Sequence, residues 1–199
     1  MAFHQNKSVT LLELIIAISL VAVIILGINS ISIFSRNQVI SSDRRAKLQN
    51  DISYSLDHIT KQGLKTIGNE VIYGTNSAVL VEDVLPDTSL AFFIDGNSNG
   101  QRDIPNDYWI KYTFNSVNHQ LSYCNNCGSS SAPGFCSGGT EVLSEKITVF
   151  TPTKVANFAE GNHVGVQVSE RWDPSISSST DNPEMAMHAT IQLPSVSTN

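Results

Sequence analysis

Residues 95–107, "DGNSNGQRDIPND", carry oxygen-bearing side chains at the spacing of a calcium-binding loop. Positions 1, 3, 5 and 9 of that pattern are Asp95, Asn97, Asn99 and Asp103, with Gly100 at position 6 and the Gln101 carbonyl as the position-7 ligand. Position 12 holds Asn106 where a bidentate glutamate is usual, so Asp107 is the candidate substitute. So few carboxylates predict weak binding, with a dissociation constant on the order of 10⁻⁴–10⁻³ M. The alternative is a plain turn, because Asn, Asp and Gly are also turn formers.

All three cysteines, Cys124, Cys127 and Cys136, fall within 13 residues. Such clustering is typical of a disulfide-pinned loop outside the cytoplasm, or of a metal knuckle. We expect a disulfide between Cys136 and either Cys124 or Cys127, and the sequence does not decide which. One alternative is a zinc site of three thiolates with His119 as the fourth ligand, since zinc knuckles use C-x-x-C-G turns. The other alternative is three free thiols.

No other part of the chain carries a catalytic motif. The five histidines are scattered, and none lies in a nucleophile motif such as G-x-S-x-G or a zinc motif such as H-E-x-x-H. Adjacent acids such as Glu82 and Asp83 fit a solvated face better than a glycosidase site. We therefore expect no enzymatic activity and no cofactor other than calcium.

A long helix is predicted on the N-terminal side of these candidate sites. The apolar run from Val9 to about Phe34 can span the roughly 30 Å hydrocarbon core of a bilayer. Further apolar residues then recur at mostly helical spacing and predict an amphipathic continuation: Val39, Ala46, Leu48, Ile52, Leu56 and Ile59. Because no proline precedes Pro86, we expect one helix from about residue 10 to about residue 62.

After Gly68 the sequence changes to short β-rich runs separated by Gly, Pro, Asn and Asp. These runs are residues 78–85, 90–95, 108–114, 119–124, 146–150, 164–169 and 188–193. Strict alternation in "YWIKYTF" is typical of a half-buried strand, and "NSVNH" fits the turn of a hairpin. The order of a long helix followed by strands predicts an α+β fold with an antiparallel sheet.

Charge is distributed unevenly along the chain. From Thr66 onward there are 14 acidic residues against 5 basic ones, which argues against nucleic-acid binding. Residues 36–65 have the opposite balance, with 6 basic against 3 acidic. Lys7 is the only basic residue before the apolar run, so the positive-inside rule alone would place residues 36–47 in the cytoplasm.

One carboxylate, Glu13, lies near the start of the apolar run, where Leu14 through Ser35 carries no charge. A charge near the bilayer centre costs about 2.5–3.5 kcal/mol on insertion scales, so Glu13 requires an explanation. One explanation is a glutamate at a helix end that reaches the interface and interacts favourably with the helix dipole.

Together with its neighbours, "KSVTLLELIIAI", residues 7–18, resembles the type IV prepilin family, which includes the pseudopilins of type II secretion. The family pattern is a short basic leader ending in a small residue, then a hydrophobic residue, Thr, two apolar residues and Glu before an apolar helix. Later stretches resemble minor, tip-associated members: "FFIDGNSNG", "YWIKYTF", "EVLSEKITVF" and "NPEMAMHATIQLP". Ser8 and Val9 depart from the pattern, which usually has Gly and Phe at these positions.

The resemblance implies cleavage between Ser8 and Val9 by a membrane peptidase, methylation of the new Val9 amine, and pairing of Glu13 with the amine of a neighbouring subunit. It also implies four segments: a cytoplasmic leader (1–8), a transmembrane and assembly helix in the inner membrane (9–35), an amphipathic helix (36–65) and a β-rich extracytoplasmic head (66–199). The acidity and the cysteines of the head favour this orientation over the one that the flanking charges indicate.

The expected function is that of a minor pilin or pseudopilin that initiates or caps a type IV pilus or a type II secretion pseudopilus. Its expected partners are other pilins or pseudopilins, the prepilin peptidase and methyltransferase, and the inner membrane. The alternatives are a tip adhesin, or an unprocessed membrane-anchored protein that binds calcium.

Overall fold

The computed structural model describes residues 10–67, 78–84, 86–99, 106–130, 132–157 and 161–194. The chain forms two compact units, one ending at Asp43 and the other beginning at Arg44. Helix α1 (Leu11–Gly63) contributes to both units, and its 53 residues confirm the predicted long helix. Its bounds differ from the expected ones by a single residue at each end.

In the first unit, α1 carries apolar side chains on all sides from Leu11 to Phe34. Its large hydrophobic residues from Leu11 to Phe34 are 50–76 % exposed, so they have no protein around them within the described chain. The Ser19 and Ser30 hydroxyls donate to the carbonyls of Ile16 and Leu26, which satisfies them within the helix. Such a helix is stable only in lipid or among other apolar helices.

The second unit contains two antiparallel sheets. The first sheet has five strands in chain order: β1 (Val79–Val84), β2 (Asp87–Ile94), β3 (Tyr108–Asn115), β4 (Gln120–Cys124) and β5 (Thr140–Ser144). The second has three: β6 (Ile147–Asn157), β7 (Gly161–Arg171) and β8 (Glu184–Gln192). The helix-then-strands layout is confirmed, as is the β3–β4 hairpin, but the strands form two sheets where one was expected.

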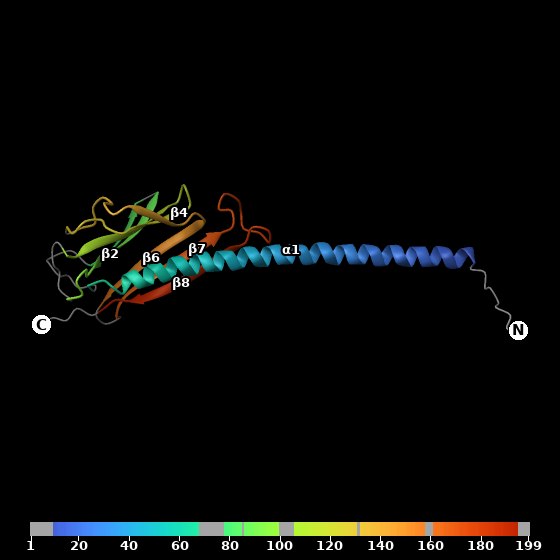
Figure 1. Ribbon diagram of the computed structural model, residues 1–199, viewed down its shortest axis with the longest axis horizontal. Coiled ribbons are helices and arrows are strands. Elements are labelled where there is room, and N and C mark those ends of the chain that lie inside the picture. The colour runs from blue at the N-terminus through green and yellow to red at the C-terminus, as the bar shows by residue number, and fades with distance from the viewer. Residues whose placement is uncertain are drawn as a thin grey trace. The chain divides into compact units, whose positions relative to one another are not determined.

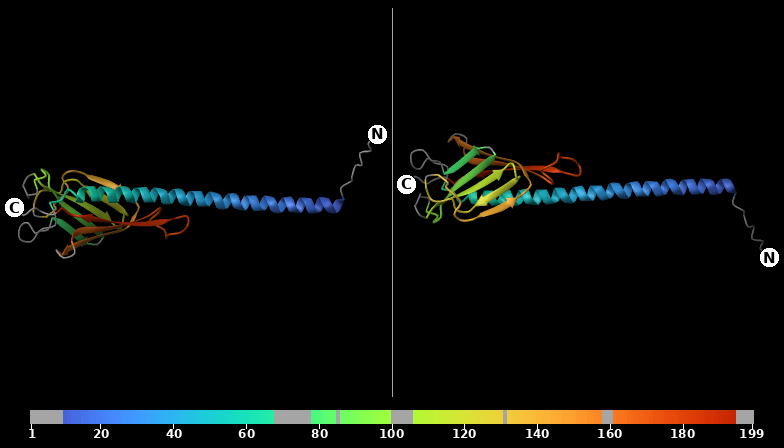
Figure 2. Two further views of the ribbon diagram at one scale, coloured as in Figure 1. Left: turned by 90° about the horizontal axis from the view of Figure 1, so that it is seen from below. Right: turned by 90° about the horizontal axis from the view of Figure 1, so that it is seen from above.

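One core joins the second half of α1 to both sheets. Leu48, Ile52, Leu56 and Ile59 are at most 6 % exposed; the last three pack with apolar residues of both sheets, as the predicted stripe requires. Figure 1 shows this teal part of α1 beside β6, β7 and β8, and Figure 2 shows the five-stranded sheet in green and yellow apart from the orange and red one. Val39 is 65 % exposed and Ala46 is also exposed, so the prediction that they belong to the stripe was wrong.

A second apolar cluster lies on the other face of the five-stranded sheet. β2 is therefore buried on both faces, with Phe92 in the main core and Phe93 in this second cluster. The cluster includes Trp109 of β3, whose indole N–H donates to the Ser130 carbonyl at 2.9 Å. The segment after β4 thus covers this face of the sheet, and it carries Cys127 into the cluster.

Candidate functional site

The start of α1 is a helix cap formed by Thr10 and Glu13. The Thr10 carbonyl accepts the Leu14 N–H at 3.2 Å, and the Thr10 hydroxyl accepts the Glu13 N–H at 3.3 Å. In return, Glu13 Oε2 accepts hydrogen bonds from the Thr10 backbone N–H at 3.0 Å and from the Thr10 hydroxyl at 3.1 Å. This reciprocal arrangement is a capping box, which satisfies backbone donors that a helix start leaves unpaired.

Thr10 was not among the predicted site residues, although the sequence contains its signal. A threonine followed three residues later by a glutamate, directly before an apolar run, is the pattern of a capping box. Ser8 and Val9 lie outside the described residues, so their processing stays a prediction. Within the described chain, α1 is long and apolar enough to cross a membrane.

The first part of the calcium-type loop is organised by its own polar side chains. Asp95 Oδ1 and Asn97 Oδ1 both accept the Asn99 N–H, each at 3.2 Å. The Asp107 side chain is fully buried, and its Oδ1 accepts the Gly96 N–H at 3.0 Å, which closes the loop. A Cβ at Gly96 would collide with the Asn106 carbonyl, so this close approach requires glycine.

These contacts form the turn that was the alternative to a calcium site. Gln101 and Asp103, two of the six predicted ligands, lie outside the described residues. The described contacts therefore account for the turn, and calcium binding stays a prediction.

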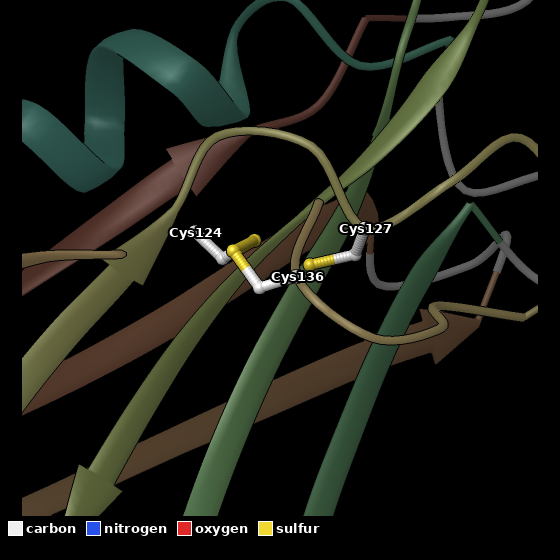
Figure 3. A group of neighbouring side chains, drawn as sticks. All are labelled: Cys124, Cys127 and Cys136. Carbon is white, nitrogen blue, oxygen red and sulfur yellow. A yellow bond between two sulfur atoms is a disulfide. The ribbon is translucent and has the colours of Figure 1, made fainter. Parts of the chain in front are cut away.

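A disulfide links Cys124, at the end of β4, to Cys136 (Figure 3). Of the two predicted pairings, the one through Cys124 is present, and Cys127 is a buried free thiol. Burial raises the pKa of the Cys127 thiol, an effect that the Lys111 ammonium partly opposes. All three sulfur atoms lie within 4.8 Å of one another.

His119 does not fit as the fourth ligand of a zinc site. It precedes β4, and its Nδ1 lies 3.1 Å from the Ile147 carbonyl oxygen. Cys124 is at the other end of that five-residue strand, about 17 Å away at the usual rise per residue.

A group of cations around Trp172 was not predicted. Lys146 Nζ lies 4.7 Å from the centre of the Trp172 ring, Arg44 lies 5.4 Å from it and Lys47 lies 6.0 Å from it. Lys146 also forms an ion pair with Asp51 at 3.5 Å. These contacts join α1 to the loops that flank the three-stranded sheet. The group could not be predicted, because its residues are too distant in sequence to form a local motif.

Glu170 of β7, next to this group, is the most unusual ionisable residue in the described chain. It is 0 % exposed, and neither carboxylate oxygen has a hydrogen-bond partner of good geometry. Burial raises the pKa of Glu170 to about 7, and the Asp51 carboxylate adds to this shift. The Ser144 hydroxyl and the Lys146 ammonium favour the charged carboxylate, so they oppose this upward shift of the pKa.

A polar contact also lies at the edge of the main core, where the half-buried His58 of α1 meets two tyrosines of the first sheet. His58 Nδ1 is 2.9 Å from the Tyr112 hydroxyl, and the ring centres of His58 and Tyr123 are 4.6 Å apart. Burial lowers the pKa of His58 and raises the pKa of Tyr112, so both groups are neutral at pH 7. We interpret this contact as a structural link between helix and sheet.

A scan against models of protein families, a search of curated proteins and a search of solved structures found no match to this chain. What the chain does must therefore be inferred from the cap, the exposed apolar helix and the head themselves.

Proposed function

We propose that the chain is a minor subunit of a type IV pilus or of a type II secretion pseudopilus. In this role it is cleaved after Ser8, and its N-terminal helix joins it to neighbouring subunits. The observation that carries the proposal is the continuous apolar surface of α1 from Leu11 to Phe34, which is exposed on all sides. Such a surface requires lipid or other apolar helices, and a subunit that moves from the membrane into a filament meets each in turn.

Glu13 has one role in any membrane anchor and a second in the proposed filament subunit. A neutral glutamine also caps helices at this position, and the negative charge of Glu13 adds a favourable interaction with the helix dipole of about 0.3–1 kcal/mol in any anchor. For a further role of the charge in assembly, the prepilin resemblance supplies a partner, the Val9 amine of the next subunit. A charge left unpaired in an apolar assembly costs several kcal/mol, so this pair would specify which subunits fit in register.

The substitution Glu13→Gln tests the charge separately from the cap. The variant keeps an oxygen that accepts the bonds from Thr10 but loses the charge. We expect it to insert and to be cleaved, while its fraction in sheared filaments falls at least about tenfold, which corresponds to about 1.4 kcal/mol. The matched control Thr10→Ala loses the cap and keeps the charge, so it should retain more incorporation. Normal incorporation of Glu13→Gln would refute the pairing role.

Processing can be measured independently by mass spectrometry of the protein isolated from its native cell. The proposal expects an N-terminal peptide that begins at Val9 and carries one methyl group. An intact Met1 would contradict it and would favour the unprocessed, membrane-anchored protein.

A further inference from the structure

The free thiol of Cys127 points toward the disulfide between Cys124 and Cys136 (Figure 3). The sulfur of Cys127 lies within 4.8 Å of both bonded sulfurs. Cys127 is only 1 % exposed, so it is held at this place in the second apolar cluster and is not a thiol on a mobile surface loop.

Hydrogen bonds that do not involve sulfur hold the backbone around Cys127. Its N–H donates to the Trp109 carbonyl at 2.6 Å, and its carbonyl accepts the Gly134 N–H at 2.7 Å. The Asn126 side chain accepts the Gly128 N–H at 2.9 Å, and the Asn126 carbonyl accepts the Ser137 N–H at the same distance. Because these bonds tie both parts of the loop together, the three cysteines should stay close when the disulfide is reduced.

We propose that Cys124, Cys127 and Cys136 form a redox-gated thiolate site for a divalent cation of the zinc and cadmium type. Three thiolates around such an ion lie about 3.7–4.0 Å apart at the usual metal–sulfur bond length, which is within the 4.8 Å that bounds all the sulfur separations in this cluster. The Cα atoms of Cys124 and Cys136 are 5.8 Å apart, so their sulfurs can reach that spacing with small side-chain rotations. This inference does not depend on the proposed filament role.

The redox step and the binding step balance separately. A dithiol reductant gives two electrons and two protons to the Cys124–Cys136 disulfide, yields two thiols and is itself oxidised to a disulfide. The cation then replaces the protons of Cys124, Cys127 and Cys136, and three protons are released to solvent. While the disulfide is closed, only Cys127 carries a proton that the cation can replace, so binding is blocked.

The surroundings of the cluster fit a site with three protein ligands and one open position. Cys124 and Cys127 are buried and Cys136 is exposed, so the cation can enter from the Cys136 side and keep a water as its fourth ligand. Three thiolates and a divalent cation carry a net charge of −1. Lys111 lies opposite Cys124 on β3 and forms an ion pair with Glu82 at 3.3 Å, and its positive charge also acts on the Cys127 thiol.

The test is a titration of the full-length protein in neutral detergent with cadmium ions alone. The ultraviolet charge-transfer band of cadmium thiolate reports binding. The protein is measured oxidised, and again after anaerobic reduction with a phosphine that is then removed. We expect one equivalent of cadmium to bind to the reduced protein, with at least about tenfold weaker binding to the oxidised protein and to reduced Cys127→Ser.

The control His119→Ala separates this site from the zinc knuckle that the sequence suggested, and it should bind cadmium like the wild type. Far-ultraviolet circular dichroism of the reduced, metal-free protein checks that the head remains folded. Equal binding by oxidised and reduced protein would overturn the proposal, as would unchanged binding by Cys127→Ser. Absence of binding by the reduced protein would also overturn it, including the case in which reduction unfolds the head, since the site is proposed to be held by the backbone.

Discussion

The buried carboxyl of Glu170 should make the stability of the head fall as the pH rises. The pKa of Glu170 is about 7 in the folded protein, against an ordinary value of 4.5, because burial disfavours the charged form. The folded state therefore binds this proton more tightly than the unfolded state does. Its contribution to stability is fully present below about pH 4.5 and is lost as the pH rises through about 7.

The size of the effect follows from the shift. Each pKa unit corresponds to about 1.36 kcal/mol, so raising the pKa from 4.5 to about 7 gives a loss of about 3 kcal/mol between acidic pH and pH 8. Glu170→Gln imitates the protonated side chain at every pH. The variant should therefore be more stable than the wild type at pH 8 by up to about this amount, and the difference should shrink toward pH 4.5.

Urea denaturation of the full-length protein in neutral detergent micelles, followed by the fluorescence of buried Trp109, measures this difference at a series of pH values. Glu145→Gln is the matched control, because Glu145 is an exposed acid on the turn between β5 and β6. Its unfolding free energy should follow that of the wild type across the range. A constant difference between Glu170→Gln and the wild type at all pH values would refute the reasoning. A variant less stable than the wild type at pH 8 would refute it as well.

Three further predictions concern the cap, the disulfide and the loop. Thr10→Ala should lose about 1 kcal/mol of cap stability and speed exchange of the Glu13 amide hydrogen about fivefold in hydrogen-exchange mass spectrometry or NMR, while Thr10→Ser should not. Cys136→Ser should lower the unfolding free energy in urea by about 2–3 kcal/mol, because it removes the disulfide that closes a loop of sequence separation 12. Cys127→Ala keeps the disulfide, so it should lower the unfolding free energy by less. If the loop binds calcium at the predicted strength, about 10 mM calcium should stabilise the protein by about 1.4–2.7 kcal/mol, and Asp107→Asn should remove the effect. An unchanged melting temperature would contradict the site.

The helix and the antiparallel strands were predictable because their signals are local. The second half of α1 repeats apolar residues at helical spacing, and β3 alternates apolar and polar residues, so each segment indicates its own buried face. β5 was not predicted as a strand. Its residues are mostly exposed, so it lacks the alternation that a buried face produces.

The division into two sheets and the role of Glu170 could not be read from the sequence, because both depend on contacts between distant segments. β7 alternates apolar and polar residues, and Glu170 follows Val164, Val166 and Val168 at the same spacing, so the pattern places it on the buried face of the strand. The pattern does not show that Ser144 and Lys146 lie near its carboxylate, because these residues come from another part of the chain. The pairing of Cys124 was undecided for a similar reason, since three cysteines in a short segment allow two partners for Cys136 until the loop path is known.

The cap and the proposed pairing of Glu13 can coexist in one carboxylate. Both cap bonds end on Oε2, and a carboxylate accepts about four hydrogen bonds in all, so an amine can approach without displacing Thr10. The cap also orders the first turn before a partner arrives, and ordering a residue at the moment of assembly would cost about 1–2 kcal/mol. Thr10→Ala should therefore assemble less well than the wild type and better than Glu13→Gln, since it loses the ordered start of the helix but keeps the charge. The opposite order would mean that Glu13 acts in assembly through the helix cap and not through its charge.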